Sequence, residues 1–295
     1  MEDIVIRKIA WDCGYAFYGH NLRSIVSYVK AYADKRGLFP EIVLREYTEK
    51  MRIVISMIHE KLKEGSPVLE VGCGGGYYLE RIRDCYNYLF LIGLDISMKA
   101  IRERKTNGEK FSNIEFVEAD ATYLPFKEGV FDCVYSSETL EHILHIEKFF
   151  DEAFRIMKKG ALLVALTPNG ARINPILLLA APLLMFNKVK KKNITEAKIK
   201  EPPKPYDKAL SASKLRHLSR QKGFHAVNVR FFFHFPPHSC FAKELNLSKR
   251  IYNLFRLISP ILRILLKPYG QLLILSAEKT LRDKVGCRYE GSIYL

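Results

Sequence analysis

The sequence predicts an α/β fold: a doubly wound, mostly parallel seven-stranded sheet with N-terminal helices and a helical cap insertion. Three observations predict it. Short apolar runs alternate with amphipathic stretches between residues 41 and 170. A glycine-rich bend joins the first apolar run to the next helix. Acidic residues follow the second and third runs, at the edge of the sheet where the carboxyl ends of parallel strands meet.

The first strand and the bend after it are the centre of this pattern. Residues 68–72, Val-Leu-Glu-Val-Gly, follow Pro67 and predict a short buried strand. The bend contains four glycines: Gly72, Gly74, Gly75 and Gly76. Glycine is needed where a tight turn requires positive φ and where a side chain would hold a ligand off the backbone. The unit is typical of nucleotide binding.

The spacing of the glycines indicates which nucleotide is bound. A dinucleotide fingerprint would place its third glycine at position 77, which is Tyr77. The sequence instead reads Glu70-x-Gly72-x-Gly74-x-Gly76, with an acid inside the strand. This pattern resembles motif I of the class I S-adenosylmethionine-dependent methyltransferases, a family with a Rossmann-like fold.

The downstream acids strengthen this resemblance. Asp95 ends a predicted strand at 88–94, where a carboxylate can accept hydrogen bonds from ribose hydroxyls. Asp120 follows a predicted strand at 113–118, and the resemblance implies that it binds the adenine amino group. The order and spacing of these signals over residues 41–170 are similar to those of ubiquinone and menaquinone biosynthesis methyltransferases and their small-molecule relatives.

The resemblance implies S-adenosyl-L-methionine as cofactor and a set of residues that bind it. That set is Glu70, Gly72, Cys73, Gly74, Gly76, Asp95, Ile96, Asp120, Ala121, Ser136 and Ser137. The candidate catalytic residue is His142, just past the predicted strand at 130–135, although it fits a plain helix N-terminal residue equally well. No metal is expected, because no cysteine pair has C-x-x-C spacing and prolines separate His234 from His238.

The remaining elements are predicted from periodicity. The predicted helices span 41–62, 76–84, 97–105, 138–157 and 211–222, and further strands span 161–167, 223–233 and 270–279. Residues 1–40 form either a lid over the substrate or an ordinary helix on the sheet. We expect a core at 41–170, an apolar and lysine-rich cap insertion at 171–210, the rest of the core at 211–280 with a basic amphipathic helix at 243–267, and a tail at 281–295.

Charge suggests the kind of partner. The chain has 47 basic and 32 acidic residues, a net charge of +15, which favours an anionic partner. The apolar run at 176–186 is too short to span a bilayer, which takes about 20 residues. Lysines follow this apolar run between residues 188 and 204. The run and the lysines together fit contact with an anionic membrane surface, or else a buried cap helix followed by a solvated loop. The segment at 243–267 leaves the same two interpretations open.

These observations predict a methyltransferase acting on a hydrophobic small molecule or a lipid-like acceptor of quinone or polyprenyl type. The alternative is an RNA or protein methyltransferase that uses the basic surface. Base-methylating enzymes usually carry a Pro-Pro-aromatic motif after the fourth strand, where this chain has residues 136–139, Ser-Ser-Glu-Thr. The first residues do not resemble a secretory signal, so we expect a cytoplasmic protein, peripheral at the membrane if the basic segments bind it.

Overall fold

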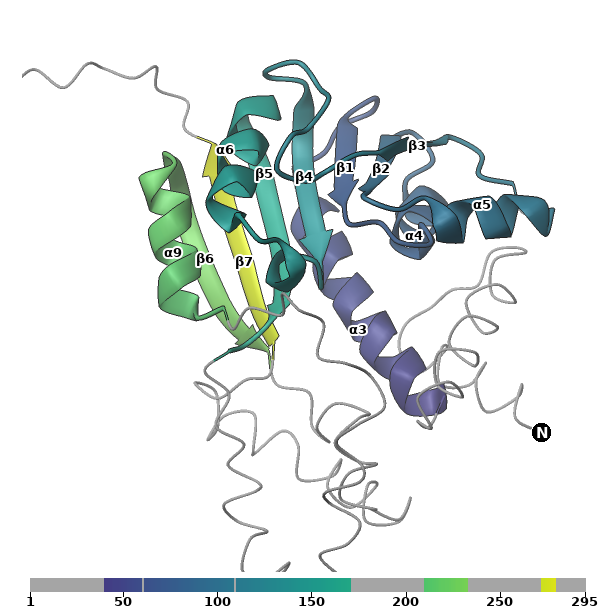
Figure 1. The fold of residues 1–295 in the computed structure, drawn as a ribbon, viewed down its shortest axis with the longest axis horizontal. Helices are drawn as coiled ribbons and strands as arrows, with labels where there is room; N and C mark the ends of the chain where they lie inside the picture. The colour runs from purple at the N-terminus through teal and green to yellow at the C-terminus, as the bar shows by residue number, and fades with distance from the viewer. Residues whose placement is uncertain (1–39, 60, 109, 171–209, 233–271, 280–295) are drawn as a thin grey trace, which may run out of the picture.

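The computed structural model describes five stretches of the chain: residues 40–59, 61–108, 110–170, 210–232 and 272–279. They form one sheet with helices on both faces (Figure 1). The predicted lid, cap insertion, basic amphipathic helix and tail lie outside the described residues, apart from residues 40 and 210 at their boundaries.

The sheet has seven strands in the order β3-β2-β1-β4-β5-β7-β6. β7 is antiparallel to both of its neighbours, and every other pair is parallel. The predicted mostly parallel sheet is therefore confirmed. The strands are β1 (Pro67–Val71), β2 (Phe90–Asp95), β3 (Ile114–Glu118), β4 (Phe131–Ser137), β5 (Met157–Pro168), β6 (Phe224–Phe232) and β7 (Leu272–Lys279).

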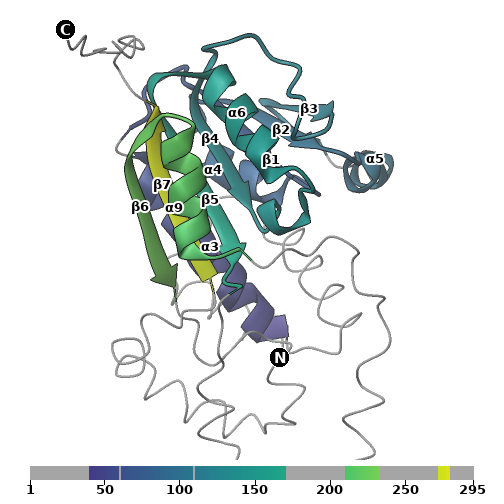
Figure 2. The same cartoon turned by 60° about the vertical axis from the view of Figure 1, so that its left-hand side comes forward.

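Helices cover both faces of this sheet, as the alternating pattern predicts. The helices are α3 (Pro40–His59), α4 (Tyr77–Cys85), α5 (Lys99–Thr106), the 3₁₀ turn η1 (Leu140–His142), α6 (Ile146–Ile156) and α9 (Ala212–Gln221). α3, α4 and α5 lie on one face of the sheet, and α6 and α9 lie on the other (Figure 2). One apolar cluster joins the first set to the sheet, and a second joins the other set to it. The fold is thus doubly wound.

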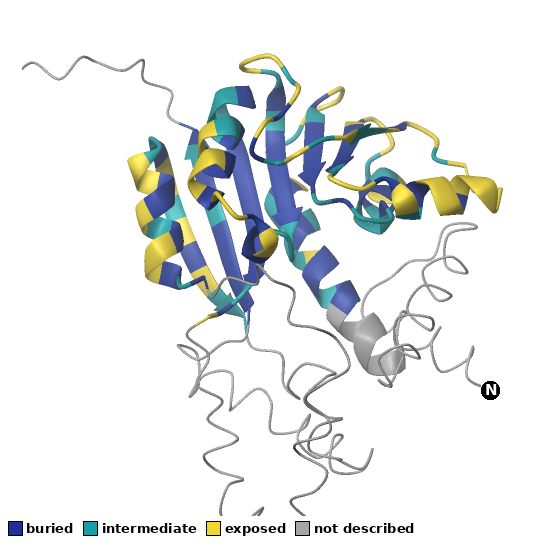
Figure 3. Cartoon of the chain, viewed as in Figure 1, coloured by how far each residue is buried: buried dark blue, intermediate teal, exposed yellow. Residues whose placement is uncertain are grey.

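The local sequence explains where these elements begin and what they bury. The central strands are buried on both faces, and the exposed residues lie mainly on the outer sides of the helices and in the loops (Figure 3). Phe149, Phe150 and Ala153 lie on the buried side of α6. Ser211 caps the start of α9, because its hydroxyl accepts the Lys214 N–H at 3.2 Å.

The predicted continuous helix over 138–157 is wrong. The chain forms η1, then a short non-helical segment at 143–145, and α6 begins only at Ile146. Glu138 has a φ of +52°, a left-handed conformation that cannot lie inside an α-helix. Glu141 is buried, and its carboxylate accepts a hydrogen bond of 2.9 Å from Thr167 at the end of β5. This contact holds the segment against the sheet.

β1 and β4 lie side by side at the centre, and the strand order reverses between them. In an open α/β sheet, ligands bind outside the carboxyl ends of the strands at such a reversal. The loop after β1 and η1 after β4 both leave the sheet there. Within the part of the chain that the structure describes, no helix is both long enough and apolar enough to cross a membrane.

Candidate cofactor-binding site

The loop after β1 has the conformation that its glycines predict. Gly72, Gly74 and Gly76 have φ values of +80°, +51° and +76°, all in the left-handed region. A Cβ atom on Gly72 would lie 2.1 Å from Oγ1 of Thr139, whereas one on Gly74 would meet no atom within 4 Å. Gly72 thus allows the loop after β1 and the loop after β4 to pack closely together. Gly74 leaves open space beside the backbone of the first loop.

Asp95 connects this loop to the end of β2. Its carboxylate oxygens accept the Gly74 N–H at 2.8 Å and the Ser97 N–H at 3.0 Å. Asp95 is only half-buried, and each carboxylate oxygen has a further lone pair. The structure therefore brings Asp95 and the glycine loop together, and the carboxylate can still accept ligand hydroxyls. The neighbouring Ile96 is 72% exposed and offers an apolar surface next to it.

Asp120 lies beyond β3 at the same edge of the sheet. Its Oδ1 accepts hydrogen bonds from the Thr122 backbone N–H at 2.7 Å and from the Thr122 hydroxyl at 2.8 Å. Asp120 is exposed, and both of these bonds go to one oxygen. Oδ2 is thus available for a donor such as an amino group. Ala121 beside it is half-buried.

Glu70 is buried near the carboxyl end of β1. It pairs with Tyr135 across β1 and β4, is 2% exposed, and its Oε2 lacks a hydrogen-bond partner among the described residues. Burial raises the pKa of Glu70 well above its ordinary value, and Asp95 adds to this effect, although the nearby Tyr135 hydroxyl lowers it. The Tyr135 hydroxyl is close to the carboxyl group but not in satisfactory hydrogen-bond geometry.

This burial predicts a pH-dependent stability that Glu70→Gln should remove. Because the folded-state pKa lies above the ordinary value of 4.5, the folded protein holds this proton more tightly than the unfolded chain. The stability of the wild type relative to the variant should be highest below that value. It should fall as the pH rises toward the folded pKa, by up to about 1.4 kcal/mol per pH unit. Urea unfolding of both proteins between pH 4 and pH 8 measures this difference, and parallel pH curves would contradict it.

The remaining cofactor candidates are placed less favourably. Cys73 is 6% exposed, its thiol pKa is raised by burial, and its backbone N–H donates to the Leu94 carbonyl. Ser136 is fully buried, and its Oγ has no hydrogen-bond partner among the described residues. Ser137 is half-buried at the end of β4, near the Tyr78 hydroxyl. The side chains of Cys73 and Ser136 therefore belong to the core.

His142 is exposed at the end of η1, and its backbone N–H donates to the Thr139 carbonyl. It thus lies after β4 on the same short segment that packs against Gly72. The adjacent Glu141 points inward to Thr167, and burial raises the pKa of its carboxyl group. The two neighbours therefore differ in exposure: the buried Glu141 holds the segment against the sheet, and the His142 side chain is exposed at the surface.

Tertiary contacts add residues that the sequence analysis missed. Lys50 of α3 is 5% exposed, and its Nζ lies 2.8 Å from Oε1 of Glu138 after β4. The Tyr47 and Tyr78 rings meet edge to face at 4.8 Å beside this ion pair. The left-handed Glu138 is of interest because strained backbone clusters at functional sites. Since 88 positions separate Lys50 from Glu138, no sequence spacing could have paired them.

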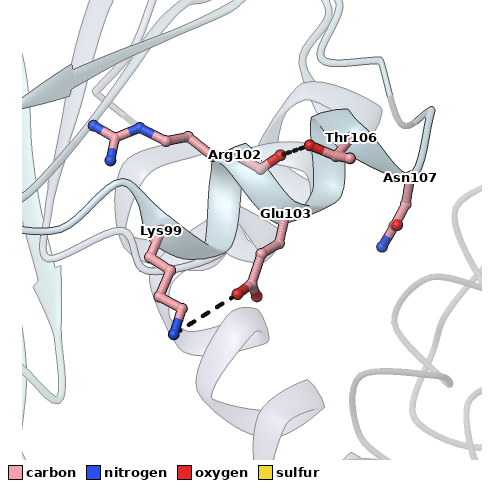
Figure 4. A pocket seen from close by; sticks show the side chains of 5 residues that line it. All are labelled: Lys99, Arg102, Glu103, Thr106 and Asn107. Carbon is pink, nitrogen blue, oxygen red and sulfur yellow. Dashed lines mark hydrogen bonds and ion pairs between the residues drawn. The ribbon is translucent and has the colours of Figure 1, made fainter.

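A separate hollow of about 550 Å³ runs along the outer side of α5 (Figure 4). Its lining residues are Lys99, Arg102, Glu103, Thr106 and Asn107. None of them belongs to the predicted cofactor set, so the hollow is distinct from the site at the strand ends. Among the described residues, no group of three or more His, Cys, Asp or Glu side chains could hold a metal ion.

These residues fit an adenosyl cofactor. Gly74 leaves open space beside its backbone, Asp95 and Asp120 retain acceptor capacity for hydroxyl and amino groups, and the buried Glu70 carboxyl lacks a full set of partners. All four lie after or at the carboxyl ends of β1, β2 and β3. They are the groups that would hold such a ligand.

Comparison with known proteins shows what this part of the chain is similar to. Residues 69–165 match the methyltransferase domain family. A sterol 24-C-methyltransferase of Pneumocystis carinii is 32% identical over 108 residues, covering 36% of this chain and 28% of that protein. A ubiquinone/menaquinone biosynthesis C-methyltransferase of Salmonella arizonae is 34% identical over 82 residues, covering 28% of this chain and 33% of that protein. The chain thus spans about a third or less of the length of these two relatives.

A solved structure has the same fold. Phosphoethanolamine N-methyltransferase 2 of Haemonchus contortus, in complex with S-adenosyl-L-methionine, matches with a TM-score of 0.51 and 16% identity. The match covers 78% of this chain and 52% of that one. Residues 69–165 are therefore similar to a methyltransferase domain, and the described part of the chain has the fold of the class I S-adenosylmethionine-dependent methyltransferases.

Proposed function

We propose that the protein transfers a methyl group from S-adenosylmethionine to a hydrophobic small molecule or a lipid-like acceptor, of quinone or polyprenyl type. The observation that carries the proposal is the hydrogen bond of 2.8 Å from the Gly74 N–H to Asp95. This bond joins the glycine loop to the Asp95 carboxylate. The backbone of the loop is open to contact with a ligand, and the carboxylate can accept hydrogen bonds from ribose hydroxyls. Asp120, two residues after the end of β3, lies at the same edge of the sheet.

The residues of the site suit a reaction that depends mainly on positioning. When bound, S-adenosylmethionine supplies a methyl group activated by a positively charged sulfur. Glu70, Asp95 and Asp120 are acidic groups that hold and orient such a ligand. Orientation of the reacting atoms contributes about 7–11 kcal/mol to catalysis. The methyl–sulfur bond would break as the bond to the acceptor forms, leaving S-adenosylhomocysteine. An acceptor that arrives protonated would lose its proton to a base, and His142, exposed at the end of η1, would accept it.

The hydrophobic acceptor has two lines of support. Two relatives of the matched domain are named for sterol methylation and for ubiquinone/menaquinone biosynthesis. The sequence also contains an apolar run at 176–186, next to the methyltransferase core. Macromolecular acceptors are the second candidate, because a net charge of +15 favours an anionic partner such as RNA.

Two measurements test the function. Titration calorimetry should detect binding of S-adenosylmethionine and of its demethylated product S-adenosylhomocysteine, and no comparable binding of NAD. Transfer of a labelled methyl group to a lipid extract, to bulk RNA or to protein then distinguishes the acceptors. Binding of NAD alone would contradict the methyltransferase, whereas label in RNA or protein but not in lipid would overturn the hydrophobic acceptor.

We further propose that the protein binds an anionic membrane surface. The segments 173–204 and 243–267, each with apolar and basic residues, support this proposal, and both lie outside the described residues. The protein should co-sediment with vesicles containing anionic lipid and much less with neutral vesicles. Absence of binding to anionic vesicles at physiological salt would contradict this proposal without affecting the proposed reaction.

Replacement of His142 tests its role as a base. His142→Gln should lower kcat by about 10²–10³-fold, because it removes a group that accepts the proton of the acceptor. The dissociation constant of S-adenosylhomocysteine should not change. His145→Gln is the matched control, since His145 is an exposed histidine three residues further along and should leave kcat unchanged. Equal rates for both variants would exclude His142 as the base.

A further inference from the structure

The side chain of Arg104, which lies on α5, reaches the glycine loop that follows β1. The residue is 5% exposed, and its guanidinium donates hydrogen bonds to the backbone carbonyl of Gly75 and to Oε2 of Glu80 in α4, the latter at 2.7 Å. Both side chains of this ion pair are almost fully buried. One planar group therefore connects α5, the loop and α4.

Aromatic rings fix the orientation of this guanidinium. Its central carbon lies 4.1 Å from the centroid of the Tyr77 ring and 4.7 Å from that of the Phe111 ring. Stacking of this kind and the fork of N–H donors are properties of arginine that lysine lacks. Arg104 is thus held in one geometry, with donors directed at two acceptors.

The bonded carbonyl belongs to Gly75, which stands between Gly74 and Gly76 in the loop. On one side of it, the Gly74 N–H donates to Asp95, and on the other, the Gly76 N–H donates to the Cys73 carbonyl. The loop is therefore tied to Asp95 at the cofactor site and to Arg104 on α5. Gly75 itself has no side chain that could fix the peptide in place.

We propose that Arg104 is a positioning residue that sets the conformation of the glycine loop and thereby the affinity for the cofactor. This inference rests on the proposed binding of S-adenosylmethionine. Arg104 acts through the Gly75 carbonyl. A buried ion pair is weak evidence for a role in stability, because well-packed apolar residues of similar volume can often replace it without loss. Stability and affinity can therefore be separated by mutation.

Two variants make this separation. In Arg104→Lys, one ammonium group replaces the stacked fork, and the dissociation constant of S-adenosylhomocysteine should rise at least about tenfold. In the double variant Arg104→Met with Glu80→Leu, an apolar pair replaces the buried ion pair. Its thermal unfolding temperature should stay close to that of the wild type, and its affinity should be reduced as in Arg104→Lys. Arg102→Lys is the control, because Arg102 lies on the same helix with an exposed side chain that pairs with Glu118.

The measurements are titration calorimetry with S-adenosylhomocysteine and thermal unfolding, both on the full chain. Wild-type affinity in Arg104→Lys or in a folded double variant would overturn the inference and leave the proposed function intact. A wild-type protein that fails to bind S-adenosylhomocysteine would instead overturn the proposed function, and the inference with it. Weakened binding in Arg102→Lys to the same extent would show that the effect is not specific to the Gly75 contact, which also overturns it.

Discussion

Gly72→Ala is expected to lower the free energy of unfolding by about 2–5 kcal/mol. Part of this loss is the left-handed backbone, with φ of +80°, which costs a residue with a Cβ about 1–2 kcal/mol. The rest is overpacking, about 1–3 kcal/mol, because the new Cβ would lie 2.1 Å from Thr139 Oγ1. Relief of this clash would push η1 away from the loop. Urea unfolding measures the loss, and binding of S-adenosylhomocysteine should weaken with it.

Two other glycines separate the causes. Gly108 has a φ of +83°, and a Cβ on it would meet no atom within 4 Å, so Gly108→Ala should lose only the backbone part. Gly74→Ala should also keep most of the stability but should weaken cofactor binding, because its Cβ would occupy the open space beside Asp95. Adding Thr139→Gly to Gly72→Ala should recover the overpacking part. Equal losses in Gly72→Ala and Gly108→Ala would contradict the close packing of the two loops.

Asp95→Ala is expected to raise the dissociation constant of S-adenosylhomocysteine at least about 100-fold. Hydrogen bonds to a charged group contribute about 1.5–3 kcal/mol each, and the variant loses those to the ribose. It also leaves the Gly74 and Ser97 N–H groups without their acceptor, which loosens the loop. Asp95→Asn retains one acceptor oxygen and should give an intermediate value. Titration calorimetry measures the dissociation constants of the wild type and of both variants.

Asp132→Asn is the control for this prediction. Asp132 lies near the start of β4, at the opposite end of the strand from the site, and pairs with Lys158 at 2.8 Å. Its replacement removes an acidic side chain from the same sheet and should leave the affinity unchanged. If Asp95→Ala bound S-adenosylhomocysteine as tightly as Asp132→Asn does, Asp95 would have no part in cofactor binding.

Most of the fold follows from local pattern. The run at 68–72 predicts β1, and the glycines predict the turn into α4. These features depend only on neighbouring residues, so periodicity and turn chemistry are enough to find them. The positions of Asp95 and Asp120 at strand ends follow in the same way, since parallel strands bring their carboxyl ends to one edge.

Local pattern failed where a distant contact decides the conformation. The residues at 138–157 have helical periodicity, yet the left-handed Glu138 and the bond from Thr167 to Glu141 break the helix. Cys73 and Ser136 remain predicted cofactor-binding residues, and the burial of their side chains could not be read from the sequence. In both cases the deciding information is which neighbouring strand or helix each side chain faces, and this is not encoded in spacing alone.

The sequence by itself determined the α/β class, the glycine loop and the acids at the strand ends, because each depends on residues close together in the chain. Only the tertiary structure placed Thr139 against Gly72, Lys50 beside Glu138 and Arg104 behind Gly75. These contacts join segments that the strand order and register bring together. Their physical basis is packing between elements, which a one-dimensional pattern of polar and apolar residues does not specify.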